Sequence, residues 1–280
     1  MTSDFPALPD FERPPVIEVV LSLQFEPLPK MQVQHIGLLW EKFKKRFPRV
    51  ETKPPLDPVA EIFDQKPVRP TMRFQVGEFP LFPRTWFVSE SGGELIQVQA
   101  DRFIHNWRKT GDESIYPRYD RIRKDFESAL GTLVQFLREH SLGELKPNQC
   151  EITYINHILA GDGWNTHGDA NRILKPLKED FAIPFLPTPE ATKFSSRYVL
   201  RQGPAGQGKP FGRLYVEMNP AFSADLKSIF VLNLTVRSVP AGQDIKSAMQ
   251  CYDIGRKHIV CTFDAITTDA MHRIWGKHDS

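Results

Sequence analysis

Amide and arginine side chains alternate with apolar residues along several short segments of this sequence. In residues 230–237, for example, Asn233, Thr235 and Arg237 alternate with large apolar residues. Successive side chains of a β-strand point to opposite faces, so this pattern predicts a sheet with one apolar and one polar face. Amide and guanidinium groups donate and accept hydrogen bonds but do not titrate near neutral pH. The polar face is therefore suited to ligand recognition rather than to proton transfer.

The candidate binding residues are the polar members of these alternations. They are Arg73, Gln75, Gln97, Gln99, Asn106 and Arg108 in the first half of the chain, and Asn156, Tyr215, Glu217, Asn219, Asn233, Thr235 and Arg237 in the second. The set contains almost no lysine, and Trp107, Tyr154 and Tyr215 place aromatic rings among the amides, as in many ligand-binding surfaces. A solvated outer sheet face is the alternative explanation.

Patterns that resemble catalytic or metal-binding motifs each lack an essential member. Residues 203–209 match the first seven positions of a phosphate-binding loop, but Pro210 replaces the required Ser or Thr and a strand-like segment follows. Cys251, His258 and Cys261 would leave a zinc ion without a fourth ligand. No nucleophile elbow is present. We therefore expect no catalytic residue, no metal and no cofactor.

The elements that position the polar residues follow the order strand, helix, strands, helix, and this order occurs twice. The first half has expected strands at 16–25, 71–76, 84–90 and 95–108, a short one near 59–63, and helices at 34–47 and 116–140. The second half has expected strands at 150–159, 192–201, 213–219 and 229–237, and helices at 169–180 and 243–266. The strand at 95–108 is expected to bend near Ala100 and Asp101. The long helices carry apolar stripes with helical spacing.

This order predicts an α+β fold in which two repeats share one continuous antiparallel sheet, with helices on one face. Residues 1–15 are expected to form an extended N-terminal strap, 16–145 the first repeat and 146–280 the second. The element order is similar to that of the saddle of the TATA-binding protein. Such a likeness of order carries no function.

Composition is typical of an ordinary globular protein. The 280 residues include 36 Lys and Arg against 34 Asp and Glu, and a net charge of +2 does not by itself indicate a polyanionic partner. Three widely spaced cysteines suggest neither a disulfide framework nor a thiolate zinc site. The N-terminus does not resemble a signal peptide, and no stretch approaches the length of a transmembrane span. We expect a cytoplasmic protein without a membrane partner.

Several segments resemble a sporadically distributed bacterial family of uncharacterised proteins, over residues 15–276. They include VIEVVLSLQFEPL, LLWEKFKKRFPRV, PRTWFVSESGGELIQVQADRFIHNWRK, YPRY, EITYINHI and TTDAMHRIWG. No activity is established for that family, so the resemblance implies no mechanism. Its patchy distribution is shared with components of mobile elements, toxin–antitoxin systems and phage defence. The resemblance thus implies a partner protein rather than a substrate.

Three functions remain open on the sequence. The first is a non-catalytic recognition module that binds a partner protein, or a second copy of itself, through the polar sheet face. The second is a nucleic-acid-binding saddle, in which arginines contact phosphates and aromatic rings stack on bases. The third is an enzyme with a site between the repeats, using Glu217 with Arg237 or Asp101 with His105. Opposite charges on neighbouring strands are more often structural ion pairs, which disfavours the third.

Overall fold

A computed structural model describes residues 5–63, 83–111, 114–177, 185–203 and 208–278 of the chain. In sequence order the elements are β1 (Val16–Phe25), α1 (Val33–Phe43), β2 (Arg49–Lys53), β3 (Arg84–Val88), β4 (Glu94–Gln99), β5 (Arg102–Arg108), α2 (Tyr119–Glu139), β6 (Pro147–Leu159), the 3₁₀ helix η1 (Asp169–Arg172), β7 (Phe194–Arg201), β8 (Pro210–Phe222), β9 (Ser228–Ser238), α3 (Ile245–Ile266) and α4 (Asp269–Ile274).

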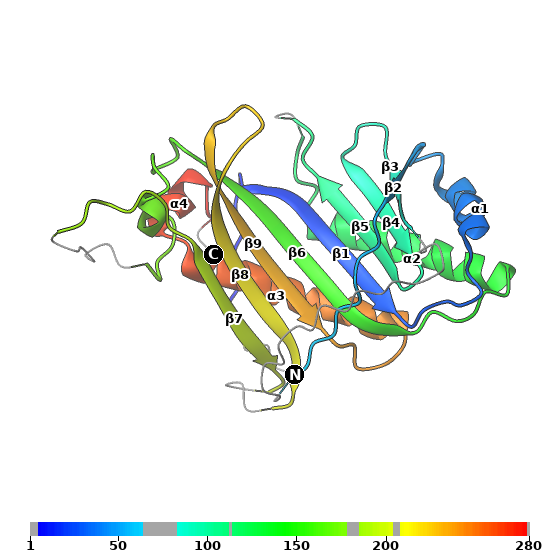
Figure 1. The fold of residues 1–280 in the computed structure, drawn as a ribbon. Helices are drawn as coiled ribbons and strands as arrows, with labels where there is room; N and C mark the ends of the chain where they lie inside the picture. The colour runs from blue at the N-terminus through cyan, green and yellow to red at the C-terminus, as the bar shows by residue number, and fades with distance from the viewer. Residues whose placement is uncertain (1–4, 64–82, 112–113, 178–184, 204–207, 279–280) are drawn as a thin grey trace. The chain divides into compact units, whose positions relative to one another are not determined.

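The strands belong to one large antiparallel sheet, so the predicted α+β class is confirmed. Within the described residues the strand order is β2-β3-β4-β5-β1-β6-β9-β8-β7 (Figure 1). The saddle-like order of two repeats is not established by this topology. The predicted first helix of the second half, at 169–180, is reduced to η1 over the residues that can be described there.

By its internal contacts the chain divides into two compact units. Unit 1 comprises Met1–Val19, Ile152–Arg237 and Asp253–Ser280, and unit 2 comprises Val20–Glu151 and Ser238–Tyr252. Four elements, β1, β6, β9 and α3, contribute residues to both units. The predicted repeat boundary between residues 145 and 146 lies within unit 2.

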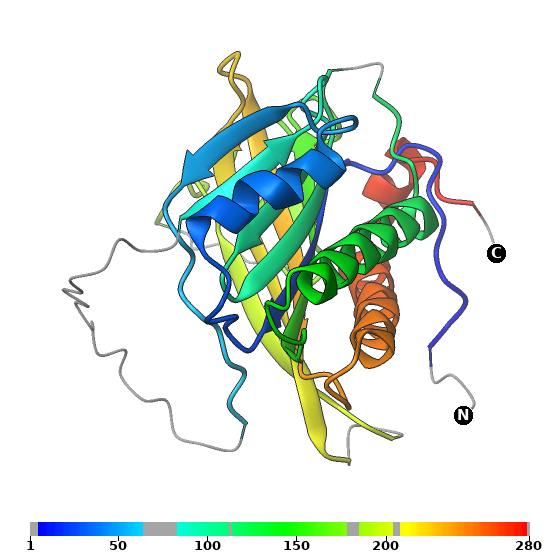
Figure 2. The ribbon, with the colours of Figure 1, turned by 90° about the vertical axis from the view of Figure 1, so that its right-hand side faces the viewer.

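In unit 2, α1 and α2 lie on the same side of the strands, as Figure 2 shows. The Phe43 ring of α1 lies 6.1 Å from that of Phe87 in β3, between ring centroids. Phe103 of β5 stacks on Phe126 of α2 at 6.2 Å, and Phe126 meets the edge of Tyr252 at 5.3 Å. These buried aromatic rings form the core and show that helices cover one face of these strands.

In unit 1, the second part of α3 covers one face of β6 and β9. A Cβ atom added at Gly255 would lie 2.6 Å from Cγ2 of Ile152 and 3.3 Å from Cγ1 of Val236, so the helix backbone approaches these strands closely. The N-terminal segment is tied to this unit, because the buried Phe11 ring packs on Phe263 and Trp275.

Local differences from the expected elements have simple causes. Residues 95–108 form the hairpin β4–β5 rather than one bent strand, with Gln99 opposite Arg102 across a two-residue turn. The prediction of a short strand near 59–63 is wrong, since that segment has neither helical nor strand structure. The strand β2 was not among the expected strands, and the strand expected at 71–76 lies outside the described residues.

Candidate functional site

The polar face of unit 2 lies opposite α1 and α2, and we call it the Gln99 face. Alternation along β3, β4, β5, β1 and β6 places on it Arg84, Trp86, Gln97, Gln99, Arg102, Asn106, Arg108, Gln24 and Gln149. Gln97 Nε2 donates a 2.8 Å hydrogen bond to Asn106 Oδ1, and Arg84 Nη1 donates one of 3.1 Å to Gln97 Oε1. The polar side chains thus bond to one another across neighbouring strands.

Residues 54–63, which we call the crossing segment, lie on the Gln99 face and are held by glutamine side chains. Gln99 accepts a bond from the amide N–H of Leu56 and donates one to its carbonyl, both of 2.8 Å. Gln24 makes the same pair with Val59, at 2.8 and 2.9 Å. A glutamine amide that donates and accepts in this way reproduces the pairing of a neighbouring β-strand.

Two further contacts extend this set along the sheet. Arg102 Nη2 donates to the carbonyl of Asp57 at 2.9 Å, and Gln149 accepts from the amide of Glu61 at 3.2 Å. The contacts come in turn from β4, β5, β1 and β6, which is the order of these strands in the sheet. The crossing segment therefore runs across the strands, with one contact residue from each, and can be followed in Figure 1.

The spacing of the contacts fits an extended chain. The two glutamines that make paired bonds lie on strands separated by one other strand, which is about 9.6 Å at the usual inter-strand spacing. The residues that they hold, Leu56 and Val59, are three positions apart, which is about 9.3 Å in a polyproline II chain. Pro54, Pro55 and Pro58 favour that conformation.

Beside the crossing segment, three cations surround the ring of Trp86. Lys53 Nζ lies 4.8 Å from the ring centroid, and the guanidinium carbons of Arg84 and Arg108 lie 5.5 and 5.2 Å from it. The pKa of Arg84 is lowered by burial and then by the charge of Arg102. Lys53 also forms an ion pair with Glu51 at 2.9 Å, so the positive charge around the Trp86 ring is partly neutralised.

The polar face of unit 1, which we call the Tyr215 face, lies opposite α3. It comprises Thr153 of β6, Arg197 of β7, Tyr215, Glu217 and Asn219 of β8, and Asn233, Thr235 and Arg237 of β9. The Tyr215 ring lies between two guanidinium groups, 5.6 Å from Arg197 and 5.1 Å from Arg237. Apart from Arg197, which is exposed, these side chains are half-buried.

Two hydrogen-bonding groups near the centre of the Tyr215 face differ in how they are satisfied. The hydroxyl groups of Thr153 and Thr235 bond to each other at 2.9 Å. Asn233 Oδ1 is buried and accepts no hydrogen bond from the part of the chain that the structure describes. A buried acceptor of this kind costs free energy unless a ligand or water supplies a donor.

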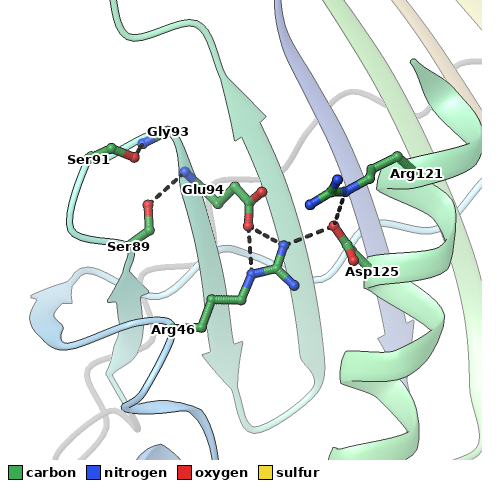
Figure 3. A network of polar contacts seen from close by, with 7 residues as sticks. All are labelled: Arg46, Ser89, Ser91, Gly93, Glu94, Arg121 and Asp125. Atoms are coloured by element: carbon green, nitrogen blue, oxygen red, sulfur yellow. Dashed lines mark hydrogen bonds and ion pairs between the residues drawn. The ribbon is translucent and has the colours of Figure 1, made fainter. Parts of the chain in front are cut away.

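On the helix side of unit 2, a network of charges joins α2 to β4 and to the turn that follows α1 (Figure 3). Arg46 donates from Nη2 to Asp125 at 2.8 Å and from Nε to Glu94 at 2.9 Å. Arg121 lies 3.6 Å from Asp125. Burial is the largest single influence on Asp125 and opposes its charge, but the hydrogen bond with Arg46 and the nearby positive charges together outweigh burial and lower the carboxyl pKa. These pairs tie helices to strands, which is a structural role.

The structure assembles most of the predicted binding residues, but on the faces of separate units. Gln97, Gln99, Asn106 and Arg108 share the Gln99 face; Tyr215, Glu217, Asn219, Asn233, Thr235 and Arg237 share the Tyr215 face. Arg73 and Gln75 lie outside the described residues. Gln24, Arg102 and Gln149 were not among the predicted binding residues. The signal that could have pointed to them is the group of prolines at positions 54, 55 and 58, in a segment without periodic pattern.

Two expectations about these residues are wrong. Asn156 lies on the helix side of β6, together with Ile152 and Tyr154, and its Nδ2 donates to the carbonyl of Leu232 at 3.0 Å. A main-chain acceptor satisfies this amide within the core. The first-half face is not open to solvent at Gln97, Gln99 and Asn106, which are buried. For Gln99 the reason is that the crossing segment covers it.

The structure separates Asp101 from His105, one of the two residue pairs considered for catalysis, whereas Glu217 and Arg237 share the Tyr215 face. Asp101 accepts a bond from Gln99, whereas His105 lies on the helix side near Arg46 and Asp125. The guanidinium of Arg237 lies over Tyr215. β8 begins at Pro210 and pairs antiparallel with β7, so residues 202–209 connect two strands and do not lead into a helix.

The described parts of the chain hold neither a cluster of metal-binding side chains nor a helix that could cross a membrane. No three His, Cys, Asp or Glu side chains converge there as metal ligands do, and Cys150 and Cys251 are free and buried. None of the helices found there combines the length and apolar character that crossing a membrane requires.

Comparison with known proteins gives no relative. No family model matches the chain, and neither the curated proteins nor the solved structures contain a significant match. The family resemblance of the sequence segments therefore stays a prediction, and the function has to be argued from the two polar faces.

Proposed function

We propose that this protein is a non-catalytic recognition module that binds an extended segment of a partner polypeptide through the polar faces of its sheet. The observation that carries this proposal is the crossing segment. On the Gln99 face, side chains of four strands hold a stretch of polypeptide by its main chain. A face built in this way is suited to polypeptide recognition, in which main-chain hydrogen bonds supply affinity.

The Tyr215 face offers related chemistry, and its Arg197 side chain is exposed. Its guanidinium groups, tyrosine ring and buried Asn233 acceptor can hydrogen-bond to and stack on a polypeptide. We therefore propose the Tyr215 face as the surface that contacts the partner first.

The test combines a charge reversal and the removal of an aromatic ring on the Tyr215 face. Arg197→Glu and Tyr215→Ala should each reduce recovery of the partner that co-purifies from the native host by at least tenfold. Arg273→Glu, a reversal of an exposed arginine in α4, is the matched control and should leave recovery unchanged. Thermal unfolding should stay within error for the reversals. Equal recovery by Arg197→Glu and Arg273→Glu would exclude this face.

A second candidate function, single-stranded nucleic-acid binding, is favoured only by the three cations around Trp86. Stacking of a base on Trp86 with phosphates on the arginines would give an affinity that falls steeply with salt. A labelled oligonucleotide that does not bind in low salt, or that binds Trp86→Ala equally well, rejects this function.

A further inference from the structure

The crossing segment is held by its main chain, while its side chains point largely to solvent. Asp57, Pro58, Ala60 and Ile62 are exposed, and Leu56, Val59 and Glu61 are half-buried. The main-chain N–H groups of Leu56, Val59 and Glu61 donate hydrogen bonds to side chains of the face. These bonds use main-chain atoms of the segment. At Leu56, Asp57 and Val59 the face therefore binds main-chain groups.

We propose that the Gln99 face is a binding site for an extended, proline-containing segment of a partner protein, and that residues 54–63 occupy this site in cis as a displaceable competitor. The inference rests on the proposed function, because it names the kind of segment that the module recognises and what regulates access to one of its faces.

The positions of proline in the crossing segment define this ligand class. Gln99, Gln24 and Gln149 each require an N–H group, and they take it from Leu56, Val59 and Glu61. The prolines occupy positions 54, 55 and 58, where no N–H is needed. Proline at those positions lowers the entropy lost on binding, since the chain is already extended. A ligand should therefore tolerate proline between its donor positions but not at them.

Displacement is compatible with the packing of unit 2. The core of this unit lies on the helix side, where Phe87, Phe103 and Phe126 are fully buried. Release of the crossing segment would expose glutamine and arginine side chains, which water can hydrate, rather than this core. The segment should therefore open at a lower free energy than the strands beneath it.

The first experiment follows this opening in the unmodified protein by residue-resolved hydrogen exchange. The amides of Leu56, Val59 and Glu61 should exchange at least tenfold faster than those of Leu23 and Val98, which lie in the strands of the same unit. Exchange at the same rate as Leu23 and Val98 would show that the segment leaves only on global unfolding, and would overturn the proposal.

The second experiment supplies the ligand in trans. In the full-length chain, residues 54–63 are replaced by ten Gly and Ser residues, and a labelled peptide with the sequence of residues 53–63 is added. Saturable binding to this variant, and at least tenfold weaker binding to the unmodified protein, is expected. Absence of saturable binding to the folded variant would overturn the proposal; if the variant does not fold, hydrogen exchange decides.

Two peptide controls separate backbone from side-chain recognition. N-methylation at Leu56 and Val59 removes two N–H donors while keeping every side chain, and should weaken binding at least tenfold. Substitution of both residues by Ala keeps the donors and should change affinity by less than about threefold. The reverse order of effects would overturn main-chain recognition.

Two further results would have a different meaning: one would identify a second copy of the chain as the occupant, and the other would reject the proposed function. A dimer that forms with increasing concentration and disappears when residues 54–63 are replaced would assign the site to the segment of a second copy, and would overturn the partner assignment. Failure of the proposed function is measured by a different variant. Arg197 lies on the Tyr215 face and does not contact the crossing segment, so unchanged partner recovery by Arg197→Glu would reject the proposed function alone.

Discussion

His105 has a buried imidazole ring on the helix side of β5, near the Arg46 network. Burial, and then the positive charge of Arg46, lower its pKa from 6.5 to about 4. Its Nδ1 accepts no hydrogen bond from the described residues. The folded protein therefore keeps this ring neutral at pH values where the unfolded chain protonates it.

This difference predicts a loss of stability in mild acid. Since the unfolded state binds the extra proton, the free energy of unfolding should fall as the pH drops from 6.5 to about 4, by about 1.4 kcal/mol per unit in this interval. His258, with its pKa lowered to about 4 by burial, acts in the same direction. Chemical denaturation at pH 7 and pH 5 measures the effect.

Substitution of His105 isolates its share of this pH dependence. His105→Phe should reduce the stability lost between pH 7 and pH 5 by about 2 kcal/mol, whatever its effect on stability at pH 7. His278→Gln, at an exposed position, is the matched control and should leave the pH dependence as it is. A pH dependence in His105→Phe as steep as in the unmodified protein would contradict this account.

At the scale of elements, the close approach of α3 to β6 and β9 gives a second prediction. Gly255→Ala places a Cβ atom 2.6 Å from Ile152, a branched side chain with little freedom to move. The resulting overpacking should outweigh the better helix propensity of Ala and destabilise the protein by about 1–2 kcal/mol.

A glycine without close neighbours provides the comparison for Gly255→Ala. Gly131 lies inside α2, and an added Cβ would meet no atom within 4 Å. Gly131→Ala should stabilise the protein by up to about 1 kcal/mol through helix propensity alone. Denaturant unfolding of both variants measures the pair, and shifts of the same sign would show that packing at Gly255 is looser than the structure indicates.

The elements also show what the sequence can and cannot predict. Period-two alternation located β1, β8 and β9, and apolar spacing located α1, α2 and α3, because these signals depend on neighbours along the chain. Residues 95–108 were expected to form one strand because their alternation hides the turn at Ala100 and Asp101. That turn matters for the site, since the hairpin register places Gln97 and Gln99 on the same face as Asn106.

The candidate site was predictable only in part for a related reason. Alternation identified polar strand residues, but it contains no information about a segment distant in sequence that covers them. Gln24 and Leu56 belong to segments without any shared local pattern, and the contact of Gln24 with Val59 spans 35 positions. Asn156 was misplaced because a main-chain carbonyl satisfies it in the core, which alternation does not reveal.

At the scale of the whole molecule, unit 2 is not a continuous stretch of chain. It requires Ser238–Tyr252 in addition to Val20–Glu151. Tyr252 is fully buried, its ring packs against Phe126, and its hydroxyl donates to the carbonyl of Ser22 at 2.8 Å. The stretch predicted as a first repeat, residues 16–145, lacks this contribution.

We therefore predict that a fragment of residues 16–151 does not fold cooperatively when expressed alone. Without Tyr252 its aromatic core is exposed, so the fragment should bind a hydrophobic dye and show no sigmoidal thermal transition. Co-expression of residues 152–280 should restore a soluble complex with such a transition. A cooperative transition in the isolated fragment would instead support an independent first repeat.

Because the Gln99 face bonds to main-chain atoms of Leu56, Asp57 and Val59, substitutions of these side chains should leave the hydrogen bonds in place unless they put proline at Leu56 or Val59. We therefore expect Leu56, Asp57 and Val59 to vary more among related genes than Gln24 and Gln99, which hold them. Natural variation within the crossing segment would then say little about its importance. Substitution of Gln24 or Gln99 would instead indicate that the segment is no longer held on the face.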